Sequence, residues 1–311
     1  MDRQSPDLRS SLVAGSTHCD GGGLYAYLAT PFDANGEVDT GTLREYASVT
    51  VASGVTGVTC LASTCEGPYL SDAERRLVVE TVGKAVGGRA RLNAGVGALS
   101  TRHAIEFARQ ARDAGATCLM LEMQQYFPVT FEAAYRHYEA VADAVALPIR
   151  LYNITLPTRF DFTPDRIAAM GAISAIHSVK EASGDVSRIR DIRALCGNRF
   201  KLHCGFHYQA VDGFRYGADG WEVMLHPLIA PHCVELYGML RADPWSPQAQ
   251  ALYRRLEPLF YFFKQRGVPQ SIKAMSEWSD LKLGKPRAPY AELSQEEKVR
   301  LQQIVLELDI L

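Results

Sequence analysis

Lys180 is the residue of this sequence whose type and position best suit chemistry. It ends the apolar run Ala175-Ile176-His177-Ser178-Val179 and precedes Glu181-Ala182-Ser183-Gly184-Asp185, so we expect a strand to deliver its amine to the strand's carboxyl end. The chain holds 8 Lys against 25 Arg, and no other Lys lies between Lys84 and Lys201. An interior lysine in an arginine-rich chain suggests attack on a carbonyl to form a Schiff base. The segment alone also permits an ion-paired, structural lysine.

Two further strand ends carry groups that suit a 2-oxo acid. One apolar run ends in Leu61-Ala62-Ser63-Thr64, whose hydroxyls and amides could hold a carboxylate, although a Ser-Thr pair also suits a helix cap or turn. Another ends in Leu151-Tyr152-Asn153, where the phenol could carry protons or could simply be packed. Together with Lys180 these groups would supply a nucleophile, an anion site and a proton carrier.

An alternation of short apolar runs and helical patterns would bring these strand ends together. Strands are expected at 24–29, 57–61, 91–94, 118–122, 149–153, 176–180, 201–205 and 221–225. Helix signals lie between them, for example Ser71 and Glu74 at capping-box spacing before 77–86. Eight uninterrupted strand-helix units predict an α/β fold of the closed (β/α)8 type, a TIM barrel, with its chemistry at the carboxyl ends of the strands.

We expect three parts along the chain. Residues 1–23 are interpreted as a flexible N-terminal extension, 24–240 as the barrel and 241–311 as a C-terminal helical extension. Amphipathic stretches at 247–264 and 294–308, with a shorter one at 269–277, support the last assignment.

Composition narrows the class of protein. The 311 residues are 47% hydrophobic and 22% charged with a net charge of -2, which favours a globular protein without nucleic-acid or membrane partners. Seven scattered cysteines without a C-x-x-C pair argue against zinc or a disulfide framework and for the cytoplasm. No apolar run reaches membrane-spanning length, and the first residues lack the apolar core of a signal peptide.

Six motifs occur along residues 24–240 in a fixed order. They are Ala29-Thr30-Pro31-Phe32, Ser63-Thr64-x-Glu66, Leu70-Ser71-x-x-Glu74-Arg75, Ala94-Gly95-Val96-Gly97, Tyr152-Asn153 and Lys180-Glu181-Ala182-Ser183-Gly184-Asp185. In these motifs the chain resembles the dihydrodipicolinate synthase and N-acetylneuraminate lyase superfamily of class I pyruvate aldolases.

The resemblance implies a role for each matching residue. Lys180 would form the Schiff base with C2 of pyruvate or of a longer 2-oxo acid. Thr64 would hold the carboxylate, and the Ser63 hydroxyl would relay a proton to Tyr152 as acid and base. Tyr126 aligns with a tyrosine that enters from a neighbouring subunit, which implies a homo-oligomer, a dimer or a tetramer. The family's mechanism needs no metal and no cofactor.

One departure from the family concerns its best-known substrate. Pro157 stands where the true synthases have an arginine that binds the carboxylate of the aldehyde, and Arg159 lies two residues later. Because a bidentate arginine contact is geometrically exacting, we expect the shift to abolish it. Cys65 replaces a glycine and is either a reactive thiol or a small apolar filler.

The last two strands also depart from the pattern. Glu222 replaces an apolar residue that faces the oxo acid. An inward carboxylate would stabilise the cationic imine or bind a substrate hydroxyl and could move protons, whereas an outward one would pair with an arginine. The family's Ser-Gly-Asp-Asp reads Cys-Gly-Phe-His here, and Gly205 is expected to bind substrate. His207 and His203 either recognise the distal part of the substrate or are ordinary polar residues of the wall.

Three hypotheses follow. The first is a Schiff-base-forming lyase, an aldolase or a dehydratase, that acts on pyruvate or a hydroxylated 2-oxo acid through Lys180. The second is a 4-hydroxy-tetrahydrodipicolinate synthase that condenses pyruvate with aspartate semialdehyde, against which Pro157 counts. The third is a barrel that binds an oxo acid without turnover.

Overall fold

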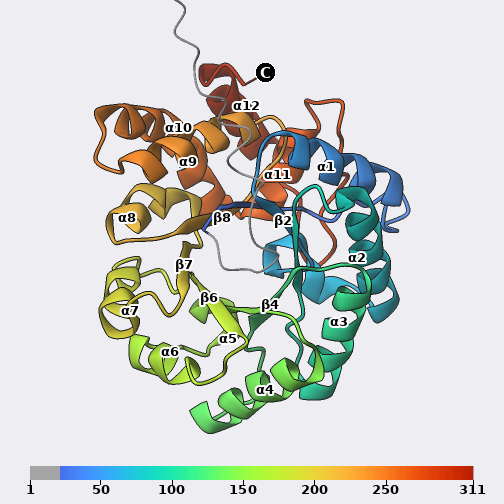
Figure 1. The fold of residues 1–311 in the computed structure, drawn as a ribbon. Coiled ribbons are helices and arrows are strands. Elements are labelled where there is room, and N and C mark those ends of the chain that lie inside the picture. The colour runs from blue at the N-terminus through green and yellow to red at the C-terminus, as the bar shows by residue number, and fades with distance from the viewer. Residues whose placement is uncertain (1–21, 311) are drawn as a thin grey trace, which may run out of the picture.

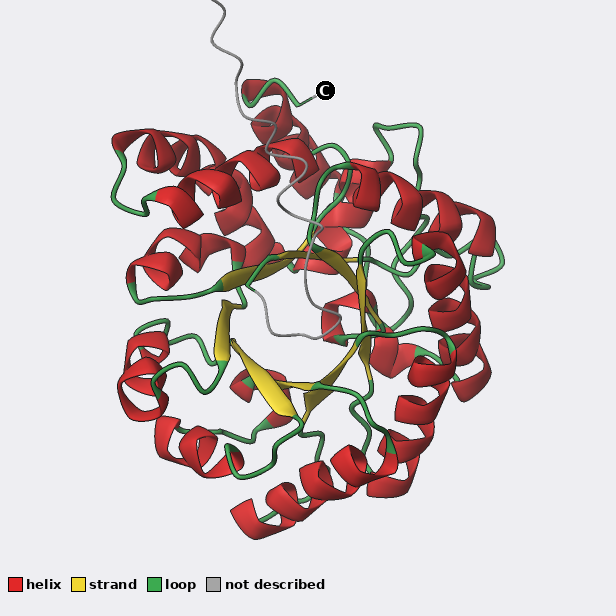
Figure 2. Ribbon diagram, in the orientation of Figure 1, coloured by secondary structure: helices red, strands yellow, loops and turns green. Residues whose placement is uncertain are grey.

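A closed ring of eight parallel strands forms the centre of the molecule, with helices around it (Figures 1 and 2). The computed structural model describes residues 22–310. Every strand pairs with its neighbour in the chain, and β1 (Leu24–Tyr27) closes the ring by pairing with β8 (Gly220–Met224). This confirms the predicted (β/α)8 barrel. Most of the expected N-terminal extension, 1–21, lies outside the described residues.

The strands coincide with the predicted apolar runs to within one or two residues at each end. They are β1 (Leu24–Tyr27), β2 (Gly57–Cys60), β3 (Arg91–Gly95), β4 (Cys118–Glu122), β5 (Ile149–Asn153), β6 (Ile176–Glu181), β7 (Lys201–Cys204) and β8 (Gly220–Met224). Nearly every strand residue is buried, because helices cover the outer face and side chains fill the interior.

The helices that follow the strands begin at capping residues where the sequence indicated them. Asp39 caps α1 through the amide of Thr42, and Ser71 and Glu74 form the expected capping box of α2. The barrel helices are α1 (Thr40–Ala52), α2 (Asp72–Val86), α3 (Thr101–Asp113), α4 (Phe131–Ala144), α5 (Thr155–Thr158), α6 (Pro164–Met170), α7 (Arg188–Cys196), α8 (Ala210–Arg215) and α9 (Ala230–Ala242).

A C-terminal group of helices packs against the barrel near β8 (Figure 1). It comprises α10 (Pro247–Arg266), α11 (Val268–Ser276) and α12 (Gln295–Glu307), which confirms the helical extension. Because α9 runs through residue 240, the domain boundary placed there cuts a continuous helix. None of the described helices is long and apolar enough to cross a membrane.

The cysteines differ in state. The thiols of Cys60, Cys65, Cys196, Cys204 and Cys233 are free. Cys118 is disulfide-bonded, which the scattered cysteine spacing did not predict.

Candidate active site

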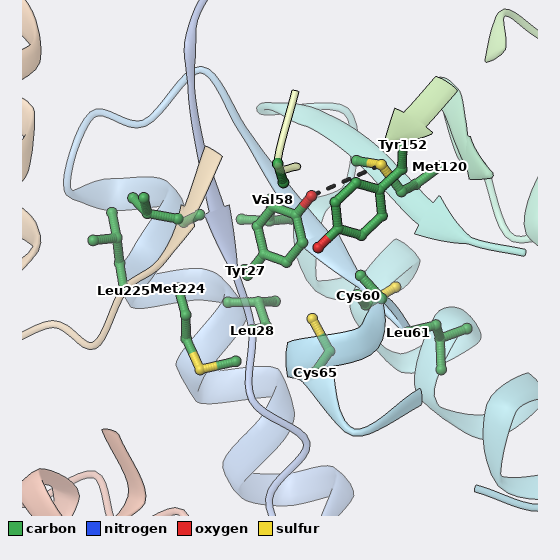
Figure 3. Packing of buried hydrophobic residues seen from close by; sticks show 14 of the residues in the cluster. Tyr27, Leu28, Val58, Cys60, Leu61, Cys65, Met120, Tyr152, Met224 and Leu225 are labelled. Atoms are coloured by element: carbon green, nitrogen blue, oxygen red, sulfur yellow. Dashed lines mark hydrogen bonds between the residues drawn. The ribbon is translucent and has the colours of Figure 1, made fainter. Parts of the chain in front are cut away.

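Lys180 lies near the carboxyl end of β6 with its side chain inside the barrel, and it is only 3% exposed. Its Nζ sits 4.0 Å from the ring centroid of Tyr27 and 4.1 Å from that of Tyr152, two rings that lie together in Figure 3. Among the described residues no hydrogen bond or ion pair holds this amine. Burial lowers the pKa of Lys180 to about 8, against an opposing attraction from Glu222. The amine is therefore partly neutral near physiological pH and free to attack a carbonyl.

Tyr152 and Ser63 form a hydroxyl pair beside this amine. Tyr152 is the neighbour of Lys180 in the register of β5 and β6, and its hydroxyl lies 3.3 Å from Oγ of Ser63. Burial raises the pKa of Tyr152, so the phenol keeps its proton at neutral pH. Ser63 and Thr64 open the 3-10 turn η1 (Ser63–Cys65) directly after β2, and both are half-buried. The structure thus gathers the predicted nucleophile, proton carrier and hydroxyl pair at one end of the barrel.

The turn that carries Ser63 and Thr64 is strained and externally held. Leu61 and Glu66, on either side of it, both have left-handed backbones, with φ of 63° and 64°. The buried Glu66 carboxylate pairs with Nζ of Lys273 at 2.7 Å and accepts from the backbone N–H of Arg287 at 2.7 Å. Contacts from α11 and from the segment between α11 and α12 therefore fix the geometry of the expected carboxylate site.

A buried arginine joins the segment that follows this turn to the end of β3. Arg75 donates to the carbonyls of Gly67 at 2.9 Å and Gly95 at 2.7 Å, and its guanidinium stacks on the Phe107 ring. Two neighbouring strand ends are thereby held in a fixed relation.

Glu222 points into the barrel from β8, where it meets both an arginine and a tyrosine. Its Oε2 accepts from the Tyr27 hydroxyl at 2.7 Å, and its Oε1 pairs with the Arg150 guanidinium. The Nδ1 of His203 lies 3.2 Å from the same oxygen without aligning as a hydrogen bond. The sequence predicts either an inward Glu222 that serves the imine or the substrate, or an outward Glu222 paired with an arginine. The side chain points inward and also pairs with an arginine, so each prediction holds in part.

Arg150 is the main group that sequence analysis overlooked. It is fully buried in β5, donates through Nε to Ser178 at 2.9 Å and stacks on the Tyr25 ring at 4.3 Å. A signal existed, because Arg150 stands two residues before Tyr152 and so shares its face of the strand. Arg150 is in register with Ser178, so its pair with Glu222 lies nearer the amino ends of the strands than Lys180 does. The carboxylate raises and the guanidinium lowers the pKa of the Lys180 amine.

Gly205 and His207 differ in their relation to the amine. A Cβ added at Gly205 would lie 2.9 Å from Cε of Lys180, so this glycine makes room for the Lys180 side chain. His207 is buried elsewhere, with Nε2 2.9 Å from the carbonyl of Met224 and its ring against Phe260 and Phe263 of α10. Burial lowers the pKa of His207 to about 4. His207 makes no contact with Lys180, although the charge of that amine also contributes to the lowered pKa of His207.

Tyr126 lies outside the site of its own chain. It is 83% exposed in the segment between β4 and α4 and packs edge-to-face on Phe127, which is also exposed. A single chain leaves this ring available to another subunit.

The expected departures from the synthase pattern also have clear places. Pro157 is exposed within the short helix α5, and the Arg159 side chain that follows is exposed and without a described partner. Cys65 is buried with Sγ 3.5 Å from the carbonyl of Thr59, and burial raises its pKa, as suits a packed filler.

A (β/α)8 barrel with a buried, unpaired lysine at the carboxyl end of a strand and a tyrosine-serine hydroxyl pair beside it defines a class I, Schiff-base-forming lyase. Comparison with known proteins then places the chain more closely. The family model for the dihydrodipicolinate synthetase family matches residues 20–308, and the chain belongs to this family.

Relatives and solved structures match over nearly the whole chain. A 4-hydroxy-tetrahydrodipicolinate synthase of Prochlorococcus marinus (strain NATL2A) is 30% identical over 93% of this chain and 96% of its own, and one of Nitrosococcus oceani is 31% identical over 93% and 99%. Among structures, a putative dihydrodipicolinate synthetase from Pseudomonas aeruginosa has a TM-score of 0.89 at 32% identity, covering 93% of this chain and 99% of its own. A chloride-inhibited dihydrodipicolinate synthase from Acinetobacter baumannii, complexed with pyruvate, has a TM-score of 0.88 at 27% identity, covering 94% and 100%.

Proposed function

We propose that this chain acts on pyruvate or a longer, hydroxylated 2-oxo acid, as an aldolase or a dehydratase, with Lys180 as the nucleophile. The observation that carries the proposal is the buried Lys180 amine, which has aromatic rings around it and no described ion pair to keep it charged. An amine in this state is a better nucleophile than one held in a salt bridge, because its lone pair is free.

The first step joins Nζ of Lys180 to C2 of the oxo acid. The carbonyl oxygen leaves as water, and one further proton supplied through Tyr152 leaves a protonated imine. The imine then withdraws the electron pair of a bond at C3. Tyr152 can pass protons to Ser63 because their oxygens are 3.3 Å apart. This pair supports Tyr152 as the acid and base and Ser63 as the relay.

Binding of the substrate carboxylate is assigned to Thr64 and the turn that it shares with Ser63. This turn lies next to Tyr152, whose hydroxyl is 3.3 Å from Oγ of Ser63. Glu222 is not assigned a direct contact with substrate, because Tyr27 and Arg150 already occupy its oxygens. Its negative charge would instead balance the positive imine, and its hydrogen bond would hold the Tyr27 ring against Lys180. No substrate contact is assigned to His207.

A homo-oligomer in the cytoplasm completes the proposal. Tyr126 and Phe127 are exposed beside the barrel mouth, and family resemblance assigns Tyr126 to the site of a neighbouring subunit. Sedimentation should give a dimer or a tetramer. The variant Tyr126→Ala should slow turnover without weakening Schiff-base formation at Lys180. A monomer with full activity would contradict this arrangement.

Dihydrodipicolinate synthesis is the second candidate, favoured by the names of the relatives. Pro157 and the exposed Arg159 count against it, because they leave no arginine fixed at the expected place among the described residues. A coupled assay with pyruvate and aspartate semialdehyde decides between the two. Turnover at ordinary enzyme rates would favour the synthase.

Reductive trapping tests the main proposal. Borohydride added with pyruvate, or with a panel of longer 2-oxo acids, should leave a stable adduct that peptide mass spectrometry locates on Lys180. The adduct mass separates an intact substrate from a pyruvate fragment. Absence of any adduct on Lys180 across the panel would refute the assignment of the nucleophile.

A further inference from the structure

A second carboxyl group stands at the mouth of the barrel, on β4. Glu122 ends that strand, two residues after Met120, whose sulfur lies 3.8 Å from the Tyr27 hydroxyl inside the barrel. Because side chains alternate along a strand, Glu122 points inward as well. Its neighbour in the register of β4 and β5 is Tyr152, which in turn neighbours Lys180. The carboxyl group therefore lies next to the proposed acid and base, on its side away from the nucleophile.

Half of this carboxyl group is unused. Oε1 accepts from Nε2 of Gln124 at 2.9 Å, whereas Oε2 is buried and has no hydrogen-bond partner among the described residues. The side chain is only 3% exposed. Leaving a buried carboxyl oxygen without a partner is costly, so proteins rarely retain one unless something else occupies the position. No described cation is paired with it, and burial raises the pKa of Glu122.

A glycine makes room for this group. A Cβ added at Gly97, in the loop after β3, would lie 2.4 Å from Cδ of Glu122 and 2.5 Å and 2.7 Å from its two oxygens. The backbone of Gly97 is not in the left-handed region, so conformational freedom does not explain the glycine. The glycine is explained by the space that the Glu122 carboxyl group needs.

We propose that Glu122 is a substrate-binding residue whose free oxygen takes a hydroxyl group on the 2-oxo acid beyond C3. This rests on the proposed function, because Lys180 marks C2 and Tyr152 lies between the two side chains. A hydroxyl fits the position because it can either donate to a carboxylate or accept from a carboxylic acid. The substrate class narrows to 2-oxo acids that carry a hydroxyl group beyond C3.

Borohydride trapping with 2-oxopentanoate and its 4-hydroxy and 5-hydroxy derivatives, each measured separately, tests the proposal. For each acid the concentration that gives half-maximal borohydride adduct on Lys180 is measured, counting all adducts of any mass. Wild type should prefer at least one hydroxylated acid over 2-oxopentanoate by about 10-fold or more, as one hydrogen bond to a carboxyl group permits. Glu122→Leu should bring that ratio close to one.

A second variant and a control keep the test decisive if Glu122→Leu fails to fold. Gly97→Ala retains the carboxyl group but displaces it, so the same ratio should fall. Glu106→Leu, an exposed glutamate on α3, should keep the wild-type ratio. Equal half-maximal concentrations in wild type, or an unchanged ratio in a folded Glu122→Leu or Gly97→Ala protein, would overturn the proposal. Lack of any adduct, even with pyruvate, would instead refute the assignment of Lys180.

Discussion

Two lysines are buried in the described part of this chain, and they lie in opposite surroundings. Lys180 is 3% exposed at the end of β6 and has aromatic rings about 4 Å from Nζ but no anion in contact. Lys273 is 1% exposed in α11, where Nζ pairs with Glu66 at 2.7 Å and donates to the carbonyl of Lys285 at 2.9 Å. Burial lowers the pKa of each to about 8.

The comparison shows that a lowered pKa does not identify a nucleophile. Both amines have a pKa of about 8, but the Lys273 amine would have to leave Glu66 and lose its proton before it could attack a carbonyl. Lys180 needs to displace no described partner. The atoms in contact with the nitrogen therefore distinguish a catalytic lysine from a structural one. The two sites are also connected, because Glu66 pairs with Lys273 and flanks the turn that holds Ser63 and Thr64.

The largest expected difference between the two lysines is in covalent trapping. Lys180→Met should lower the yield of the borohydride adduct with pyruvate by at least about 1,000-fold, because no other amine is placed to replace it. Lys273→Met should still give an adduct on Lys180. Peptide mapping of both proteins provides the measurement, and an adduct on Lys273 in wild type would reverse the assignment of roles.

For the free energy of unfolding we expect the reverse order, with a loss in Lys273→Met and a gain in Lys180→Met. Lys273→Met leaves the Glu66 carboxylate buried with only the amide of Arg287 as a partner, so the free energy of unfolding should fall by about 3–5 kcal/mol. Chemical denaturation of the apoprotein measures this. The double variant Lys273→Met with Glu66→Gln is the matched control, because it removes both charges and should recover part of the loss. Equal stability of wild type and the single variant would mean that the pair is not buried in solution.

Lys180→Met should instead stabilise the protein at neutral pH. The folded state holds Lys180 at a pKa of about 8 against 10.5 for an ordinary lysine, so burying its charge costs up to about 3 kcal/mol below pH 8. Between pH 8 and 10.5 the unfolded chain binds more protons at this position, so stability from Lys180 rises with pH across that window. The difference in unfolding free energy between Lys180→Met and wild type should therefore be largest below pH 8 and shrink toward pH 10.5. A constant difference would show that the amine is not desolvated.

The sequence was sufficient for the barrel and for Lys180, because both depend on local patterns. Apolar runs of strand length mark the eight strands, and a lysine at the end of such a run must lie at the catalytic end of the barrel. His207 shows the limit of that reasoning. It follows β7 as a site residue would, but the 3-10 turn η3 (His207–Gln209) places its ring against α10, a helix some fifty residues later.

Arg150 and Glu222 show a second limit. Each lies in a strand that reads as apolar, and only closure of the barrel brings β5 and β8 across from one another so that the two charges pair. A charge in a buried strand signals that some partner exists, but spacing along the chain does not say which one. The pairing, like the contact of Lys273 with Glu66, depends on long-range geometry.

The smallest expected effect separates contact from influence at a distance. Neither Glu222 nor Arg150 touches Lys180, but the first raises and the second lowers its pKa. The pH midpoint of pyruvate trapping, about 8 in wild type, should therefore move down in Glu222→Gln and up in Arg150→Met, each by less than about one pH unit. The double variant should return close to the wild-type midpoint because the opposing effects cancel. If both single variants moved the midpoint in the same direction, the pair would act on Lys180 by moving the Tyr27 ring rather than by its charges.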